Sequence, residues 1–445
     1  MKQNYSLTLT VHTIPTKMKH LLITTLLWLL AGQVLAQTPL PSTTPEKVGM
    51  SANRLAQIDK HLQNYVDKQW VAGAVAIVAR NGSIVYHKNF GQNNAEAKTP
   101  MQKDDIFRIA SMTKPIVSLA MLMLYEENRF NLDDPVSNFI PEFKSLQVLD
   151  SVSTKDSTAV AKPTRKPITI RQLMSHTSGI GYSFVNPTIK MLYAKAGVPD
   201  SPVQIGTKGV KTGDKMKVLA ALPLLHQPGE RWTYGLSTDM LGYLVEVISG
   251  QSLEDFLAQR IFKPLGMNDT HFGLPPTKAN RLVKMTYENP KGELMSYPSD
   301  NPATGYPDFP LGSGNTYFSG GSGLVSTAMD YLKFVQLLLN GGELNGTRLV
   351  SRKTVELMTT NQIGNLVISP AGEKFGLGLS VPSDQSGYRL LGAATSFGWG
   401  GAFTTSFWFD KKEKIAAVLM TQIAPTTHGD IADKFKVAVY QSIND

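Results

Sequence analysis

The 445-residue sequence contains no cysteine, and this absence excludes several kinds of chemistry. Without thiols the chain can form no disulfide, no thiolate metal site and no cysteine nucleophile. Its eight histidines include neither an H-E-x-x-H motif nor a pair four residues apart, so we expect no metal ion and no other cofactor. The G-x-S-x-G motif is also missing, which argues against an α/β-hydrolase.

A concentrated patch of positive charge is missing as well. The formal net charge is +9, but the lysines and arginines are scattered along the chain and form no dense basic stripe. We therefore expect no nucleic-acid partner. Hydrophobic residues make up 42% of the chain, which is typical of a globular protein, and the length allows two or three lobes.

The N-terminus has the pattern of a secretory signal peptide. Lys17 and Lys19 precede an apolar run at 21–35, and small residues end at Ala36. The alternative is a membrane anchor, but the run is shorter than the roughly 20 residues that a span requires. We predict a signal peptide at 1–36 and a periplasmic or secreted protein without stable membrane insertion after cleavage. Whether translation begins at Met1 or at Met18 stays open.

The remaining chain, 37–445, is predicted to be one domain with two lobes. A helical pattern at 52–68 is followed by two strand-like runs, and Asn81-Gly82 between them is typical of a tight hairpin. Near the other end, strand-like runs are expected at 375–381, 388–392, 404–410 and 414–422. A C-terminal helix is expected at 430–443. These patterns predict an α/β (α+β) lobe of about 50–110 and 370–445, a helical and loop lobe of about 111–369, and an exposed insertion at about 150–167.

A serine and a lysine stand at the start of the most apolar helical pattern, in "RIASMTKPIVSLAMLMLYEEN". Ser111 and Lys114 are three residues apart, so they share one face of a helix. Burial disfavours the ammonium form, and a lysine placed in this way can serve as a base for the serine hydroxyl. S-x-x-K alone is a weak signal, and the alternative is an N-cap serine with an incidental lysine.

Six segments resemble, in the same order, those of the class C β-lactamase and penicillin-binding-protein superfamily of serine hydrolases. They are "VGMSANRLAQID", "GAVAIVARNGSIVYHKNFG" and "ITIRQLMSHTSGIGY", then "PGERWTYGLSTDMLGYLVEVISG", "GGSGLVSTAMDYLKFVQLLLNGG" and "FGWGGAFTTSFWFD"; "FRIASMTKP", the segment of Ser111 and Lys114, resembles the first motif of the same superfamily. The resemblance implies a β-lactamase/transpeptidase-like fold: an antiparallel sheet flanked by N- and C-terminal helices, with an inserted, mostly helical lobe. It also implies that Ser111 is the nucleophile and that Lys114 is its lysine partner.

The same resemblance assigns the catalytic tyrosine to Tyr234, which would carry the serine proton to the leaving group. The alternative is a core tyrosine with a satisfied hydroxyl. Leu236 stands where lactam-cleaving members have the asparagine of Y-x-N, thought to hold the acylamide arm of the lactam. Y-x-L is similar to the esterase branch, the family VIII carboxylesterases, and puts lactam hydrolysis in doubt.

Trp399-Gly400-Gly401 stands in the place of the family's K-T-G motif. Its glycines would let a backbone approach the substrate closely, and the amides of Ala402 and Ser111 would form the oxyanion hole. Trp399 and Leu236 would contact substrate, and an indole suits a neutral, apolar group rather than a carboxylate. A tight entry to a strand is the structural alternative.

Together these features predict a secreted serine hydrolase that cleaves carboxylic esters through an acyl-enzyme. The same machinery could act as a β-lactamase, or as a peptidase on D-Ala cell-wall peptides. A non-catalytic penicillin-binding-like protein is the alternative of another class. We expect a small ester or lactam as ligand; the physiological substrate and the oligomeric state stay open. His176, in "SHTSG", resembles a structural turn residue of the family and is not expected to be catalytic.

Overall fold

The computed structural model describes residues 40–152, 159–198, 209–297, 309–311, 314 and 316–445. The expected signal peptide lies outside these ranges. Residues Leu40–Asp445 form one compact unit. Within the described ranges, no helix combines the length and the hydropathy needed to cross a membrane.

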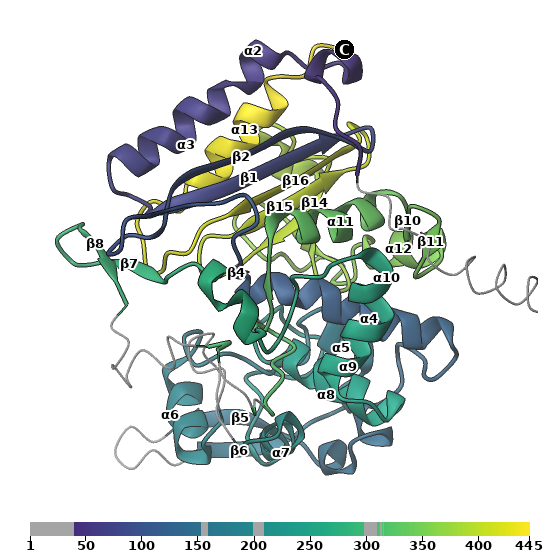
Figure 1. Cartoon of the computed structure of the whole chain (residues 1–445). Helices are drawn as coiled ribbons and strands as arrows, with labels where there is room; N and C mark the ends of the chain where they lie inside the picture. Colours follow the sequence, from purple (N-terminus) through teal and green to yellow (C-terminus); the bar gives the residue numbers. More distant parts are fainter. Residues whose placement is uncertain (1–39, 153–158, 199–208, 298–308, 312–313, 315) are drawn as a thin grey trace, which may run out of the picture. The chain divides into compact units, whose positions relative to one another are not determined.

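An antiparallel sheet of eight strands is the centre of the fold (Figure 1). Its strand order is β12-β13-β14-β15-β16-β1-β2-β3, so strands from both ends of the chain lie side by side. The strands are β1 (Gly73–Arg80), β2 (Ser83–Asn94), β3 (Thr99–Pro100), β12 (Lys374–Phe375), β13 (Ser380–Val381), β14 (Ser396–Gly400), β15 (Ser406–Asp410) and β16 (Ile415–Met420). This sheet and its flanking helices confirm the predicted fold class.

The other described elements form four short ladders and the helices. The ladders are β4–β9 (Phe107–Arg108, Val325–Ser326), β5–β6 (Gln147–Val152, Ala159–Pro163), β7–β8 (Thr286–Glu288, Leu294–Ser296) and β10–β11 (Glu343–Leu344, Thr347–Arg348). The α-helices are α2 (Ala52–Leu55), α3 (Gln57–Asp67), α4 (Thr113–Glu126), α5 (Ile170–Met174), α6 (Pro187–Ala196), α7 (Thr212–Val218), α8 (Ser237–Ser249), α9 (Leu253–Leu257), α10 (Lys263–Leu265), α11 (Ala328–Leu339), α12 (Arg352–Met358) and α13 (Ile431–Tyr440).

The expected hairpin is present where the sequence predicts it. Asn81 and Gly82 both have positive φ, 52° and 76°, as the two-residue turn between β1 and β2 requires. The expected strand at 388–392 is wrong: Asp384–Tyr388 forms a 3₁₀ helix, and turns follow it up to β14. Short apolar runs are poor evidence for a strand when no partner is known.

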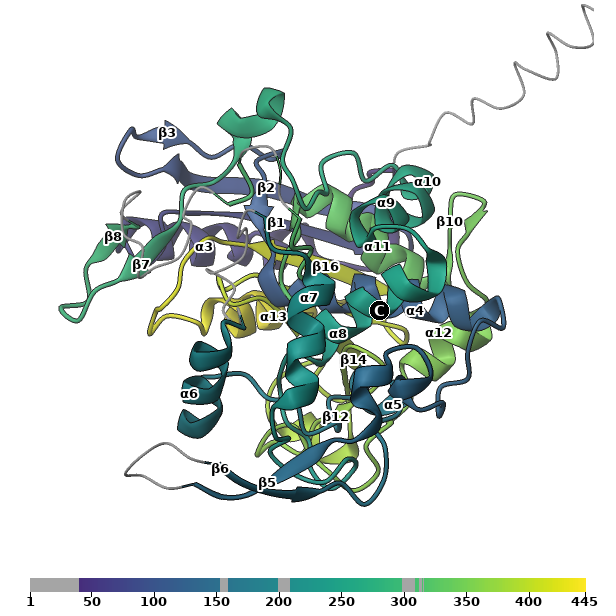
Figure 2. The same cartoon turned by 90° about the horizontal axis from the view of Figure 1, so that it is seen from below.

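The sheet separates two hydrophobic layers, because side chains alternate between its faces. On β1, Ala76 and Val78 pack into the layer with α3 and α13, whereas Val75 and Ile77 pack into the larger core with α4 and α11. Figure 1 shows α3 and α13 on one side of the sheet and α11 on the other, and Figure 2 shows the helices of the second side from below. The larger core is therefore the one that reaches the Ser-Lys segment.

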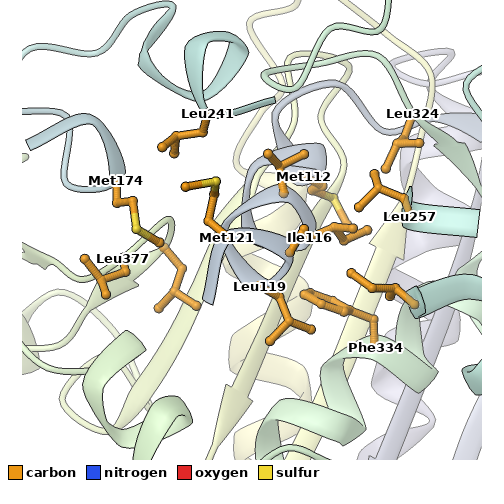
Figure 3. Close-up of a cluster of buried hydrophobic side chains, with 14 of the residues drawn as sticks. Met112, Ile116, Leu119, Met121, Met174, Leu241, Leu257, Leu324, Phe334 and Leu377 are labelled. Atoms are coloured by element: carbon orange, nitrogen blue, oxygen red, sulfur yellow. The ribbon is translucent and has the colours of Figure 1, made fainter. Parts of the chain in front are cut away.

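Helix α4 lies in the middle of this larger core. Its residues from Thr113 to Leu124 are all buried, and apolar side chains from several elements surround it (Figure 3). The helix does not open at Ser111 as expected: Ser111 belongs to a short 3₁₀ helix, Ala110–Met112, and α4 begins at Thr113. Pro115 still falls in the first turn, where its missing N–H costs no hydrogen bond.

Candidate active site

Ser111 lies at a sharp turn between a short strand and the central helix. Strand β4 ends at Arg108, Ile109 donates to the carbonyl of Leu324 over 3.1 Å, and Ala110 then takes a positive φ of 42°. A non-glycine residue seldom adopts this conformation, so the surrounding contacts must hold it. The turn leaves the Ser111 side chain partly exposed, although both of its chain neighbours are buried.

Lys114 is fully buried, and its ammonium nitrogen is within hydrogen-bond distance of three oxygens. Nζ donates to Ser111 Oγ at 3.1 Å, to Tyr182 Oη at 3.1 Å and to the Gly321 carbonyl at 2.8 Å. It also lies 4.5 Å from the ring centroid of Tyr234. The structure thus brings Ser111, Lys114 and Tyr234 together. A carbonyl can only accept, so Gly321 fixes the direction of one N–H at this nitrogen.

Tyr182 is the residue at this site that sequence reasoning missed. Its hydroxyl contacts Lys114 directly, its side chain is buried, and its ring lies edge-on to that of Tyr234 with centroids 5.3 Å apart. Tyr182 ends the family-like segment "ITIRQLMSHTSGIGY", which is the only signal the sequence offered. No spacing in the sequence connects it with Lys114, 68 residues earlier.

Tyr234 is held from several sides by aromatic rings. Its hydroxyl oxygen accepts a hydrogen bond from Nε1 of Trp399 at 3.2 Å, and Trp232 stacks on it with centroids 5.9 Å apart. His176 lies 5.0 Å away, centroid to centroid, and is fully buried. Burial and the nearby charge of Lys114 hold the pKa of His176 well below its ordinary value. His176 is therefore neutral and packs behind the tyrosine.

The segment that carries Ala402 packs directly against the segment that carries Ser111. A side chain at Gly401 would meet the carbonyl oxygen of Ile109 at 2.4 Å, so only glycine allows this approach. The Gly401 amide donates to the Thr405 carbonyl at 2.8 Å and closes the turn between β14 and β15. Ala402 itself is exposed in this turn, beside the cleft.

A cavity of about 390 Å³ opens over Ser111. The described residues that line it include no aspartate, glutamate, lysine, arginine or histidine. They are Ser111, Tyr182, Phe184, Tyr234, Ser322, Trp399, Gly400, Gly401 and Ala402. Phe184 stands at this cavity with 68% of its surface exposed and stacks on Tyr182 with centroids 5.1 Å apart. The cavity is suited to neutral groups with apolar or aromatic parts.

Leu236, predicted to contact substrate, is not among the residues that line this cavity. Only 2% of its surface is exposed, and it packs in the core at the start of α8. Trp399, Gly400 and Gly401, predicted with it, do line the cavity. The structure therefore separates Leu236 from the other three.

A buried carboxylate lies behind the lysine. Asp239 is 1% exposed; its Oδ1 accepts from Ser319 Oγ at 2.5 Å and from the Gly321 amide at 3.2 Å. Burial raises the pKa of Asp239, against the opposing effects of the Ser319 hydrogen bond and the charge of Lys114. The Gly321 peptide unit connects the two residues, since its N–H donates to Asp239 and its carbonyl accepts from Lys114. Asp239 thus positions the loop that orients the lysine.

Comparisons of sequence and fold show that the chain has known relatives over most of its length. A family model described as Beta-lactamase matches residues 58–441. Protein Rv1367c of Mycobacterium tuberculosis is 32% identical over 83% of this chain and 90% of its own length. Lovastatin esterase of Penicillium rubens is 29% identical, over 85% of this chain and 96% of its own. The solved structure of EstCE1, a hydrolase with promiscuous acyltransferase activity, superposes with a TM-score of 0.74 at 25% identity, covering 88% of this chain and 99% of that one.

Proposed function

This chain belongs to the beta-lactamase family, and we propose that it cleaves carboxylic esters through an acyl-enzyme on Ser111. It is a serine hydrolase, related over most of its length to an esterase. The observation that carries the proposal is the 3.1 Å contact between Ser111 Oγ and Lys114 Nζ at the base of a cavity without a charged wall. A nucleophile and its base within hydrogen-bond reach are what acyl transfer requires.

Acylation follows from these contacts. With Lys114 as the free amine, its two N–H groups donate to Gly321 and Tyr182, and its lone pair accepts the proton of the Ser111 hydroxyl. Ser111 Oγ then bonds to the ester carbonyl carbon, and the carbonyl oxygen becomes an oxyanion. The amides of Ser111 and Ala402 are the donors proposed for this charge.

Collapse of the tetrahedral intermediate breaks the bond to the alcohol oxygen. That oxygen takes up the proton now on Lys114, directly or through the hydroxyl of Tyr234, and the alcohol leaves. A water molecule then attacks the acyl-enzyme with the same groups acting in reverse, which releases the carboxylic acid and restores the Ser111 hydroxyl. Each proton taken from a nucleophile returns to a leaving oxygen, so no cofactor is needed.

The substrate proposed for this cavity is a neutral ester with an apolar or aromatic part. Trp399 and Phe184 offer ring faces, and the described residues that line the cavity include no lysine, arginine or histidine to pair with a substrate carboxylate. A β-lactam or a peptide with a C-terminal carboxylate would leave that charge unpaired, which costs about 1–3 kcal/mol. Export to the periplasm or beyond is part of the proposal and rests on the N-terminal sequence alone.

Acyl transfer to an alcohol is a second candidate. It is favoured by the mostly apolar cavity wall, which offers the carbon chain of an alcohol a surface to pack on, and by the acyltransferase activity named for EstCE1. Adding butanol to a hydrolysis reaction with p-nitrophenyl butyrate tests it. Butyl butyrate appears in proportion to the butanol present if the acyl-enzyme accepts alcohols; formation of butyrate alone would exclude this candidate.

Labelling and a substrate comparison test the main proposal. A fluorophosphonate should attach to Ser111 in the wild type, as seen by mass spectrometry of the tryptic peptides, and Ser111→Ala should stay unlabelled but folded. The ratio kcat/KM for p-nitrophenyl butyrate should exceed that for nitrocefin by at least about 30-fold, which corresponds to about 2 kcal/mol. Label on another serine would remove Ser111 from its role, and equal ratios would favour the β-lactamase alternative.

A further inference from the structure

A glycine-rich loop at 319–323, "SGGSG", lies between helix α8 and the catalytic cavity. A side chain at Gly320 would meet the carbonyl oxygen of Thr238, a residue of α8, at 2.4 Å. The backbone of the loop therefore packs directly against that helix. Of the five loop residues, Ser322 is the one that lines the cavity. The loop thus connects the buried side of α8 with the space above the nucleophile.

A buried serine of this loop, Ser319, makes the first link from α8 toward the cavity. Only 3% of its surface is exposed, and its Oγ lies 2.5 Å from Oδ1 of Asp239. The same Oδ1 accepts a hydrogen bond from the Gly321 amide at 3.2 Å, and an amide N–H can only donate. Oδ1 is therefore an acceptor, and Ser319 donates its hydroxyl hydrogen to it.

The hydroxyl of Ser322 makes the second link. Its Oγ lies 3.2 Å from Ser319 Oγ, and the backbone N–H of Ser322 donates to the same oxygen at 3.1 Å. A serine hydroxyl has one hydrogen and two lone pairs. Because Ser319 gives its hydrogen to Asp239, it can only accept from Ser322. The Ser322 hydroxyl thus donates its own hydrogen away from the cavity and presents oxygen lone pairs to it.

An unsubstituted ester cannot use these lone pairs, because both of its oxygens are acceptors. The other hydroxyls in the cavity wall belong to Ser111, Tyr182 and Tyr234, which surround Lys114. Ser322 is instead oriented from α8. A site built to hydrogen-bond a hydroxyl of its substrate discriminates against analogues that lack it. An acceptor held in this way fits a substrate that brings a donor of its own.

We propose that Ser322 accepts a hydrogen bond from a hydroxyl group of the substrate, so that the enzyme favours hydroxylated esters. Asp239 and Ser319 are positioning residues, which fix the direction of this bond. The preference rests on the proposed ester hydrolysis at Ser111 and narrows its substrate class. A hydroxyl is the simplest neutral donor that an ester can carry, and it suits a cavity whose described lining includes no acidic residue, lysine, arginine or histidine.

The experiment compares esters in which a methyl group replaces the hydroxyl, because the two groups are similar in size. One pair differs in the acyl part: ethyl 3-hydroxybutyrate and ethyl 3-methylbutyrate. The other pair differs in the alcohol part: 2-hydroxyethyl butyrate and propyl butyrate. For each protein, pH-stat kinetics give the ratio of kcat/KM within a pair, hydroxyl over methyl. A general change in activity cancels in this ratio, and the pair that responds shows which part of the substrate carries the hydroxyl.

In Ser322→Ala, the hydroxyl-to-methyl ratio of at least one pair should fall at least about 5-fold below its wild-type value. This change corresponds to about 1 kcal/mol, the contribution of one hydrogen bond.

Ser319→Ala should lower the same ratio at least about 3-fold, although Ser319 does not line the cavity. Without Ser319 as its acceptor, the Ser322 hydrogen is free to turn toward the donor of the substrate. This variant leaves the lining of the cavity unchanged, so added space cannot explain the fall. A merely structural role of Ser319 would change kcat/KM for both esters of a pair and leave their ratio as it is.

Phe184→Ala is the matched control. It also trims a side chain of the cavity wall, but that side chain has no hydrogen-bonding group. Its hydroxyl-to-methyl ratios should equal those of the wild type in both pairs, whatever happens to its activity as a whole.

The outcomes separate this preference from the proposed function. Ratios that Ser322→Ala leaves unchanged in both pairs would overturn the preference, as would a wild type that cleaves p-nitrophenyl butyrate but none of the four esters. A fall in Ser322→Ala without one in Ser319→Ala would overturn the positioning role of Ser319 and Asp239. A wild type that cleaves no ester, p-nitrophenyl butyrate included, would overturn the proposed function itself. If Ser319→Ala does not fold, the wild-type and Ser322→Ala ratios still decide.

Discussion

Trp399 donates a hydrogen bond from its indole nitrogen to the hydroxyl oxygen of Tyr234, across 3.2 Å. The two residues come from different elements, β14 and the segment before α8, 165 positions apart in the chain. The bond occupies one lone pair of the tyrosine oxygen and leaves its O–H free to donate toward the cleft. The tryptophan that replaces the family's lysine thus does more than change the substrate surface, because it also orients a proposed proton carrier.

Replacing this indole by a ring without an N–H tests that orienting role. Trp399→Phe should lower kcat for p-nitrophenyl butyrate about 5- to 10-fold and leave KM nearly unchanged, because one hydrogen bond of about 1 kcal/mol is lost while the aromatic wall remains. Steady-state kinetics measure both constants. Trp232→Phe is the control, since Trp232 stacks on Tyr234 without donating a hydrogen bond to it. A rise in KM alone would make Trp399 a binding residue only.

The two tyrosines near Lys114 can be told apart by single substitutions. Tyr234→Phe should slow turnover roughly 10²-fold or more if it carries the proton to the leaving alcohol. Tyr182→Phe should cost less, about 5- to 30-fold, because it removes only one of three oxygens within reach of Lys114 Nζ. Rapid-quench measurements of acylation and deacylation provide the rates. A larger loss of turnover rate in Tyr182→Phe than in Tyr234→Phe would mean that Tyr182, and not Tyr234, carries the proton to the leaving alcohol.

Phe184 offers a test of the apolar cavity wall. Phe184→Ala should raise KM for p-nitrophenyl hexanoate several-fold, leave kcat unchanged and affect p-nitrophenyl acetate little, because only the longer acyl chain reaches the ring. The matched control is Val185→Ala, which trims the exposed neighbour that does not line the cavity. Equal changes for both esters would mean that the ring shapes the loop and does not contact substrate.

His87 links stability to pH. Burial lowers its pKa to about 4 in the folded protein, from 6.5 in the unfolded chain. The unfolded state therefore binds more protons between these values, so this stabilising contribution is present above pH 6.5 and is lost as pH falls toward 4. Melting temperatures at pH 7.5 and pH 5 should differ less in His87→Gln than in the wild type. An identical drop in both proteins would show that His87 does not contribute.

Local patterns predicted much of this molecule correctly. Asn81-Gly82 places the first hairpin, because the turn's positive φ angles restrict the residues that can form it. The spacing of Ser111 and Lys114 places both side chains at one point, because their separation is fixed by three residues of helical backbone. Such predictions work where geometry is set within a few residues.

Contacts made by tertiary packing were beyond the sequence. Tyr182 and the Gly321 carbonyl reach Lys114 from loops 68 and 207 positions away, and no periodicity records that distance. Leu236 was placed beside the substrate by its position two residues after Tyr234, yet the start of α8 turns it into the core. A Leu236→Asn replacement would therefore bury an amide among apolar side chains rather than equip the cleft.

The strand order has a consequence for how the protein is made. Val75 of β1 pairs with Met420 of β16, so the central strands of the sheet come from opposite ends of the chain. All residues of β1 are buried in the folded protein. During synthesis the hairpin of β1 and β2 forms early, but β16, which pairs with β1, is made only when almost the whole polypeptide has been synthesised. Gly401 reaches the nucleophile turn only at that late stage as well. A ribosome-bound fragment that already contains Ser111, Lys114 and Tyr234 should therefore be unreactive, and its unpaired strand edge is the part of the nascent chain most in need of a chaperone.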